Sequence, residues 1–108
     1  MSYYTQYYIE VRYFETFSPI VWERRKEILD KFNNEYNVTT NITGQFMEEW
    51  SSCESDMLKL SLEYPRLLFV VNAAGEVPTD LWKGYFHDGN FQYCKGEVVY
   101  EQYQKDRL

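Results

Sequence analysis

The 108-residue chain is poor in the residues that build metal and redox sites, with one histidine and two cysteines. Cys53 and Cys94 lie far apart in the sequence and form no CxxC motif. A structural zinc site needs about four nitrogen, sulfur or oxygen ligands, which these residues do not supply. The chain also lacks a GxxxxGK[ST] or GxGxxG loop. We therefore expect no metal and no other cofactor, and two ordinary thiols in a reducing compartment.

Long apolar runs are missing as well. The longest, Leu67–Val71, is much shorter than the roughly 18–20 residues of a membrane span. The segment 1–6 has neither a basic leader nor the apolar core of a signal peptide. We expect no membrane association and a cytoplasmic location, in which the sequons at Asn37 and Asn41 are chance matches.

Basic residues are outnumbered, since 17 acidic and 11 basic side chains give a formal charge of −6. A net-acidic protein repels phosphate backbones at long range, so we expect no direct nucleic-acid binding. Hydrophobic residues make up 44% of the chain and aromatic residues 19%. With no repeat or linker visible, this composition and length predict one folded domain over residues 1–108.

The first half of the chain predicts a strand, a helix and a second strand. Residues 7–13 alternate, with Ile9 on an apolar face and Tyr8 on the opposite face. Ser18-Pro19 predicts a helix start, with Ser18 as N-cap, and the helix runs from about 19 to 36. Its apolar stripe consists of Val21, Trp22, Ile28, Leu29, Phe32 and Tyr36. Residues 38–46 predict the second strand.

The second helix is expected after Ser51-Ser52-Cys53-Glu54, which matches a capping box. Its stripe consists of Cys53, Met57, Leu60 and Tyr64, and Pro65 ends it. Leu67–Val71 has the continuous apolar character of a central strand, and a turn is expected over residues 72–76.

Asp88-Gly89 between apolar runs 81–86 and 91–103 predicts a hairpin with a two-residue type I′ turn. In the implied register His87 faces Asn90, and Gly84 faces Tyr93, for whose ring it leaves room. The resulting β-α-β-α-β-β-β order favours an α+β fold with two helices packed on one face of a mainly antiparallel sheet. We expect a ferredoxin-like arrangement extended by a C-terminal hairpin.

A longer pattern spans roughly the last two-thirds of the chain. It combines Trp50, Glu54, Asp56, Met57, Leu60, Ser61, Tyr64, Pro65, Leu68 and Phe69 with Gly75-Glu76, Asp80-Leu81-Trp82, Tyr85-Phe86 and Gly89. This pattern resembles that of a group of small uncharacterised proteins of bacteria, their phages and mobile elements. The resemblance implies a ferredoxin-like module of phage or mobile-element origin and carries no assigned chemistry. Where the group usually has lysine after the hairpin glycine, this chain has Asn90.

His87 is the one conventional general base, and we expect it to be a solvated residue beside the turn. On the predicted register, Cys94 lies about 13 Å along the strand from the partner of His87, at roughly 3.3 Å per residue. A nucleophile and its base need about 3 Å. We therefore expect a protein that is not an enzyme.

Four acids within nine residues, Glu48, Glu49, Glu54 and Asp56, form the most prominent charged cluster. They fit a solvated loop followed by acids at a helix N-terminus. They also fit an acidic patch that steers the protein onto a basic partner surface.

The N-terminal tyrosines offer a second candidate surface. If the helices cover the Ile9 face, Tyr4 and Tyr8 lie on the open face of the sheet. RNA-binding modules stack bases there, but they also need positive charge, and tyrosine is equally suited to protein interfaces. The basic cluster Arg24-Arg25-Lys26 is expected to be a solvated helix face.

These observations predict a small acidic binding protein of phage or mobile-element type that occludes a host protein. The most concrete version is an anti-CRISPR-type inhibitor that competes for a basic, nucleic-acid-binding surface. Glu48, Glu49, Glu54 and Asp56 would steer the encounter, and Tyr4 and Tyr8 would anchor it. The alternatives are a nucleic-acid-binding module using the aromatic sheet face, a carboxylate-based enzyme, and a homodimer formed through a strand edge near residues 100–103.

Overall fold

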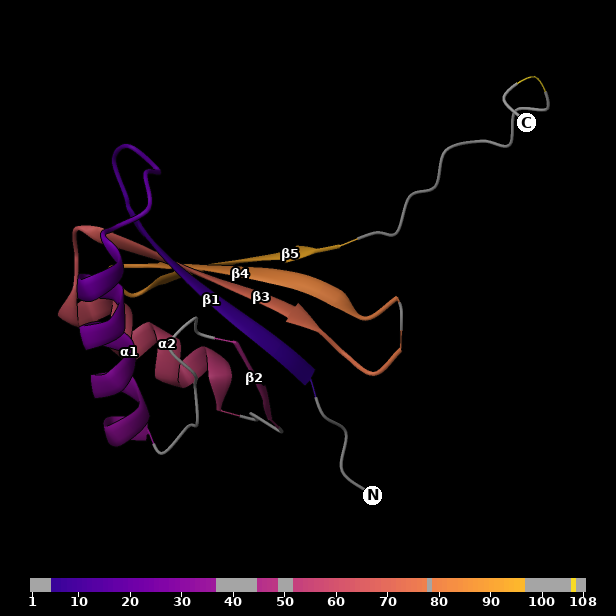
Figure 1. Ribbon diagram of the computed structural model, residues 1–108, viewed down its shortest axis with the longest axis horizontal. Helices are drawn as coiled ribbons and strands as arrows, with labels where there is room; N and C mark the ends of the chain where they lie inside the picture. The colour runs from indigo at the N-terminus through magenta and orange to yellow at the C-terminus, as the bar shows by residue number, and fades with distance from the viewer. Residues whose placement is uncertain (1–4, 37–44, 49–51, 78, 97–105, 107–108) are drawn as a thin grey trace.

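The computed structural model describes residues 5–36, 45–48, 52–77, 79–96 and 106. Over these residues two helices accompany one five-stranded sheet (Figure 1). In chain order the elements are β1 (Thr5–Tyr13), α1 (Trp22–Tyr36), β2 (Gln45–Glu48), α2 (Cys53–Glu63), β3 (Leu67–Ala74), β4 (Leu81–His87) and β5 (Asn90–Lys95). The strands lie in the order β2-β1-β3-β4-β5, and every neighbouring pair is antiparallel. The predicted α+β class is confirmed. The predicted ferredoxin-like arrangement is not, because α1 joins β1 and β2, which are adjacent and antiparallel.

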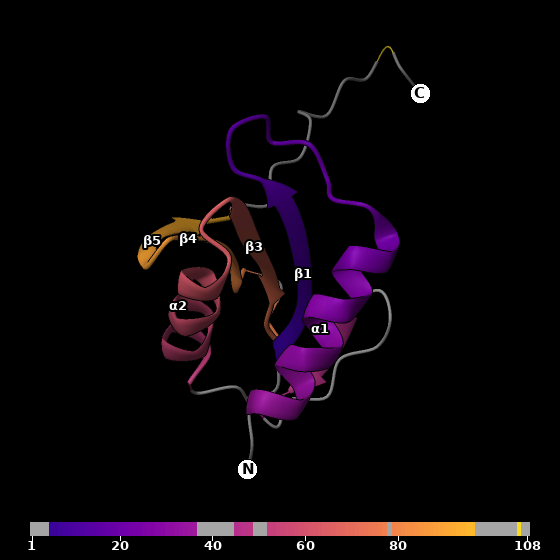
Figure 2. The ribbon, with the colours of Figure 1, turned by 90° about the vertical axis from the view of Figure 1, so that its left-hand side faces the viewer.

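The core lies between the helices and the face of the sheet that carries Ile9. Along β1, buried residues alternate with more exposed ones, as the sequence predicted. In Figure 2 both helices lie in front of the sheet. The fully buried side chains from the two helices and the three central strands include Ile9, Ile28, Leu29, Phe32, Met57, Leu60, Phe69, Val71 and Phe86. Burying each such side chain contributes about 1.5–3 kcal/mol, which holds both layers together.

Strand β3 has neighbours on both sides, and its first five residues are all buried. This explains the continuous apolar run, because Val70 is covered even though it lies on the face opposite the core residues Phe69 and Val71. The turn predicted from residue 72 is wrong in position. Asn72 still pairs with Tyr8 on one side and Lys83 on the other, so the strand ends at Ala74.

Helix α1 begins three residues later than the Ser18-Pro19 pattern predicted. Residues 18–20 instead form hydrogen bonds with the edge of β1: Tyr13 N donates to Ser18 O at 2.8 Å, and Ile20 N donates to Val11 O at 3.2 Å. Pro19, which cannot donate, lies in an isolated bridge opposite Arg12. Because residues 18–20 bond to β1 and the helix begins only at Trp22, Val21 and Trp22 are exposed rather than part of the core.

Helix α2 starts at Cys53, so its N-cap is Ser52 and not Ser51. The Ser52 side chain makes no capping bond; its Oγ donates to the Asp56 carboxylate at 2.8 Å. The capping box predicted between Ser51 and Glu54 is therefore wrong, because the N-cap is Ser52 and its hydroxyl bonds to Asp56. The predicted stripe is confirmed, since Cys53, Met57 and Leu60 are buried.

The β4–β5 hairpin has the predicted register, with His87 opposite Asn90 and Gly84 opposite Tyr93. Both turn residues have positive φ, 44° at Asp88 and 79° at Gly89, as a type I′ turn requires. The reason for Gly84 differs from the prediction. A Cβ there would lie 2.9 Å from the Phe86 ring and 3.1 Å from the Phe91 ring, so these rings, not that of Tyr93, require the glycine.

Two predicted strands are seen only in part. Of the strand predicted over residues 38–46, residues 37–44 lie outside the described residues, and β2 covers Gln45–Glu48. Of the run 91–103, β5 extends to Lys95, and residues 97–105 lie outside the described residues. The strand edge proposed for a homodimer falls in that outside segment.

Candidate functional site

The predicted acidic cluster begins where β2 ends and continues into the first turn of α2. Glu48 is the last residue of β2, and Glu49 lies outside the described residues. Glu54 is exposed, whereas the Asp56 side chain is largely buried and accepts the Ser52 hydrogen bond. Of the two cluster acids in the first turn of α2, Glu54 is thus the one presented to solvent.

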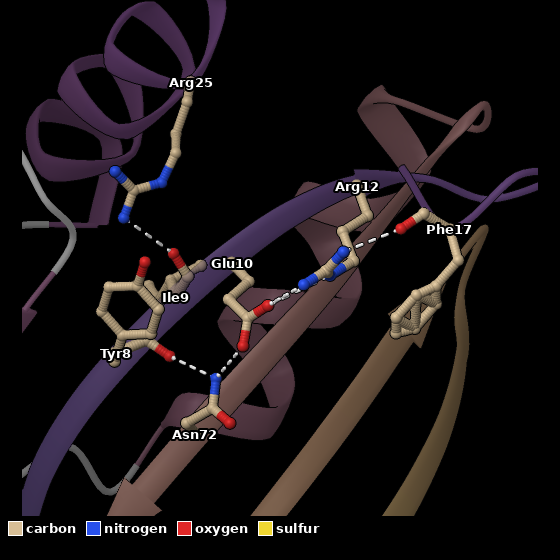
Figure 3. A network of polar contacts seen from close by, with 7 residues as sticks. All are labelled: Tyr8, Ile9, Glu10, Arg12, Phe17, Arg25 and Asn72. Atoms are coloured by element: carbon tan, nitrogen blue, oxygen red, sulfur yellow. Dashed lines mark hydrogen bonds and ion pairs between the residues drawn. The ribbon is translucent and has the colours of Figure 1, made fainter. Parts of the chain in front are cut away.

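Tyr8 lies on the face of the sheet opposite the core, as predicted from the strand alternation. Its ring is covered by Arg25 of α1, whose guanidinium carbon lies 5.4 Å from the ring centroid. The same guanidinium donates to Ile9 O at 3.1 Å (Figure 3). The pairing of β1 with β2 ends at Tyr8, so Ile9 is the next residue along the strand. Tyr4 lies outside the described residues.

Glu10, Arg12 and Asn72 form a polar network beside Tyr8 (Figure 3). Arg12 donates twice to Glu10 Oε2, at 3.0 and 2.8 Å, and Asn72 Nδ2 donates to Glu10 Oε1 at 2.8 Å. Arg12 also donates to Phe17 O at 2.8 Å and lies over the Phe17 ring. Since these groups are already bonded to one another, a ligand on this face would have to replace existing hydrogen bonds.

The described surroundings of the two cysteines do not activate either thiol as a nucleophile. Burial raises the pKa of the Cys53 thiol to about 12, and the negative charges of Asp56 and Glu54 add to the rise. Cys94 is half-buried on β5, opposite Lys83. Within the described ranges, no group of three His, Cys, Asp or Glu side chains is close enough to hold a metal ion.

His87 flanks the turn as predicted, but it is half-buried and its ring is packed rather than free in solvent. Its ring stacks on Phe14, with centroids 3.4 Å apart and planes 6° apart. Its Nε2 lies 2.9 Å from Pro65 O. Because a carbonyl oxygen can only accept, Nε2 carries a proton, which leaves Nδ1 as the acceptor in the neutral ring. The sequence contained no indication of this contact, since Phe14, Pro65 and His87 come from three separate loops or strand ends.

Positive charge and exposed aromatic rings gather in residues 12–26 and 64–66, which we call the basic end. Five basic and two acidic residues give it a formal charge of +3, so the rest of the chain carries −9. The two segments meet in space, because Phe14 N donates to Arg66 O at 3.0 Å and Arg24 lies over the Tyr64 ring. Its exposed large side chains are Tyr13, Phe14, Phe17, Val21 and Trp22. Sequence reasoning noted the Arg24-Arg25-Lys26 cluster but missed its association with these rings.

Comparison of the chain with protein-family models, curated proteins and solved structures gave no match. Among the residues described, neither helix has the length and apolar character to cross a membrane.

Proposed function

We propose that this protein is a small non-enzymatic binding protein that inhibits a host protein by covering one of its surfaces. The observation that supports this most strongly is the uneven charge: outside the basic end, the chain carries a formal −9. A surface of that sign attracts basic surfaces and accelerates encounter with them. The partner we propose is therefore a host protein whose basic surface binds nucleic acid.

The acids that would contact this partner are those between the end of β2 and the first turn of α2. Glu54 is exposed there, and Glu48 and Glu49 precede it in the chain. Asp56 contributes charge, while its hydrogen bond from Ser52 ties it to the helix start. On the open sheet face, Tyr4 and Tyr8 would supply apolar contact area, with Arg25 holding the Tyr8 ring in place.

The most concrete form of this proposal is an anti-CRISPR-type inhibitor of a bacterial defence complex, acting in the host cytoplasm. It is supported by the resemblance of residues 49–89 to small phage and mobile-element proteins. An inhibitor of this kind needs carboxylates where the nucleic acid has phosphates, which the acidic cluster would provide.

The test is a gel-shift assay of target-DNA binding by a panel of purified CRISPR effector complexes. We expect one complex to lose DNA binding as this protein is added, and the inhibition to weaken between about 50 and 500 mM salt. The double variant Glu48→Lys/Glu49→Lys and the single variant Glu54→Lys should lose inhibition. Asp30→Lys is the matched control, since Asp30 is exposed on α1, outside the cluster. Equal inhibition by Glu54→Lys and Asp30→Lys, or full inhibition by the double variant, would contradict the role of the cluster.

A further inference from the structure

A cavity of about 740 Å³ opens beside the stacked rings of Phe14 and His87. Its wall is built from the loop after β1, the loop before β3 and the end of β4, so three separate parts of the chain form it. The volume lies within the roughly 300–1,000 Å³ of small-molecule sites. No part of the function proposed above uses this cavity.

The Phe14 ring is fixed in place by packing on one of its two faces. His87 covers one of its faces, and the His87 ring is itself held by the hydrogen bond to Pro65 O. Phe14 nevertheless remains 49% exposed. A flat ring with one face packed and much of its surface in solvent can take a second planar group on its free side, with little loss of side-chain entropy.

Arg66 supplies a cation on the same wall. Its side chain is exposed and has no hydrogen-bond or ion-pair partner among the described residues. Arg66 also lines a neighbouring cavity of about 340 Å³, together with Arg24 and Tyr64, so positive charge continues beyond the first cavity. Of the acids in the two walls, Glu63 is 3.4 Å from Lys31, and Glu15 is exposed.

We propose that this cavity binds a nucleotide unit, with the base stacked on the free face of Phe14 and the phosphate on Arg66. A base offers a flat π surface, and base–aromatic stacking is tolerant of base identity. Guanidinium binds phosphate through paired charge-assisted hydrogen bonds. The +3 charge of the basic end favours an anionic ligand, whereas the −9 of the remaining chain repels a long phosphate backbone. A free nucleotide and the end of a single strand present the same chemistry.

The experiment titrates the full chain with a fluorescent single-stranded oligothymidylate of four residues, with a blunt-ended DNA duplex long enough to stay paired, and with thymidine monophosphate as a competitor. We expect micromolar binding of the single strand at low salt, with much weaker binding of the duplex. Displacement by the mononucleotide at a similar concentration identifies a free nucleotide as the ligand, and displacement only by the strand identifies a strand end.

Substitutions separate stacking from charge. Phe14→Ala should weaken binding about fivefold or more, and Phe14→Trp should restore it, because the larger ring keeps the stack. Arg66→Gln should weaken binding and lower its salt dependence by about one counterion. Glu15→Gln should tighten binding, since it removes a negative charge from the same wall. Trp22→Ala is the control, as Trp22 is an equally exposed aromatic residue that does not line the cavity.

Three results would overturn the proposal: no binding at about 100 μM protein, an equal loss in Phe14→Ala and Trp22→Ala, or equally tight binding of a labelled tetraglutamate peptide. The last result would assign the cavity to acidic protein segments. Thermal unfolding of each variant within about 2 °C of the parent shows that the fold is intact. None of these readouts depends on inhibition of a defence complex, so this proposal and the proposed function fail separately.

Discussion

The backbone N–H of Gly89, in the turn of the β4–β5 hairpin, donates to the Oγ of Ser61 on α2 at 2.9 Å. Ser61 is fully buried and its Oγ in turn donates to Leu58 O at 2.7 Å, so one hydroxyl joins the helix to the hairpin. Both residues belong to the sequence pattern between Trp50 and Gly89. With Met57 and Leu60, also in the pattern and fully buried, they hold α2 on the sheet. These residues of the pattern therefore help to build the fold.

Replacing this hydroxyl should cost stability. Ser61→Ala removes the acceptor of the Gly89 N–H, which is exposed and can bond to water instead, so we expect the free energy of unfolding to fall by about 0.5–1.5 kcal/mol. Urea denaturation measures the change. Ser55→Ala is the matched control, because Ser55 is exposed on the same helix. It should change stability by less than about 0.5 kcal/mol. Equal effects of the two substitutions would show that the hydrogen bond to the turn is not stabilising.

A methyl group at Gly84 should disturb the aromatic packing of the hairpin. The added Cβ would approach the Phe86 and Phe91 rings to 2.9 and 3.1 Å, and Phe86 is fully buried. We expect Gly84→Ala to destabilise the protein by about 1–3 kcal/mol. That loss lowers the melting temperature by several degrees in a domain of this size. Gln92→Ala, at an exposed position of β5, should leave it nearly unchanged; a drop as large as that of Gly84→Ala would refute the steric explanation.

The stability of the protein should fall in alkali through Cys53. The unfolded thiol ionises near pH 8.5–9, whereas burial raises its pKa in the folded protein to about 12. Between these values the unfolded chain releases a proton that the folded chain keeps, so the free energy of unfolding decreases as pH rises. The contribution is at most about 1.4 kcal/mol per pH unit.

Denaturation midpoints measured from pH 7 to pH 10.5 test this coupling. Cys53→Ala should show a shallower decline above pH 9 than the parent, whatever its stability at pH 7. Cys94→Ala, which removes the half-buried thiol of β5, serves as the control. Parallel declines in the parent and Cys53→Ala would contradict the assignment.

The two thiols should also differ in reactivity. Cys94 is half-buried at the sheet surface, whereas Cys53, the first residue of α2, is buried and its thiolate is disfavoured. We expect iodoacetamide at pH 8 to modify Cys94 in the native protein and Cys53 only after unfolding, since the thiolate is the reacting form. Mass spectrometry of the labelled peptides reports both sites, and rapid native labelling of Cys53 would disprove the burial argument.

The sequence predicted the elements whose causes are local. The Asp88-Gly89 pair determines its own turn, and the turn then sets the pairing of Phe86 with Phe91. Alternation in β1 and the helical stripe of α2 likewise placed Ile9 and Met57 in the core. In each case a few neighbouring residues contain the whole physical reason.

The features that sequence reasoning missed depend on distant partners. Ser18-Pro19 has the chemistry of a helix start, but the free edge of β1 offers hydrogen bonds that a helix start there would forgo. The position of His87 beside a turn suggests a solvated ring, but in the fold Phe14 stacks on this ring and Pro65 O lies within hydrogen-bond distance of it. The basic end escaped notice for the same reason, since Arg66 is 40 residues from Lys26 in the chain.

The stoichiometry of inhibition most directly tests the proposal that the protein acts by binding and covering a partner. The inhibited defence complex, held at a concentration well above its affinity for this protein, is titrated and its residual DNA binding measured. We predict that inhibition rises linearly and is complete near one equivalent per binding surface, with DNA binding restored at high salt. Complete inhibition by a small fraction of an equivalent would indicate turnover and contradict the account.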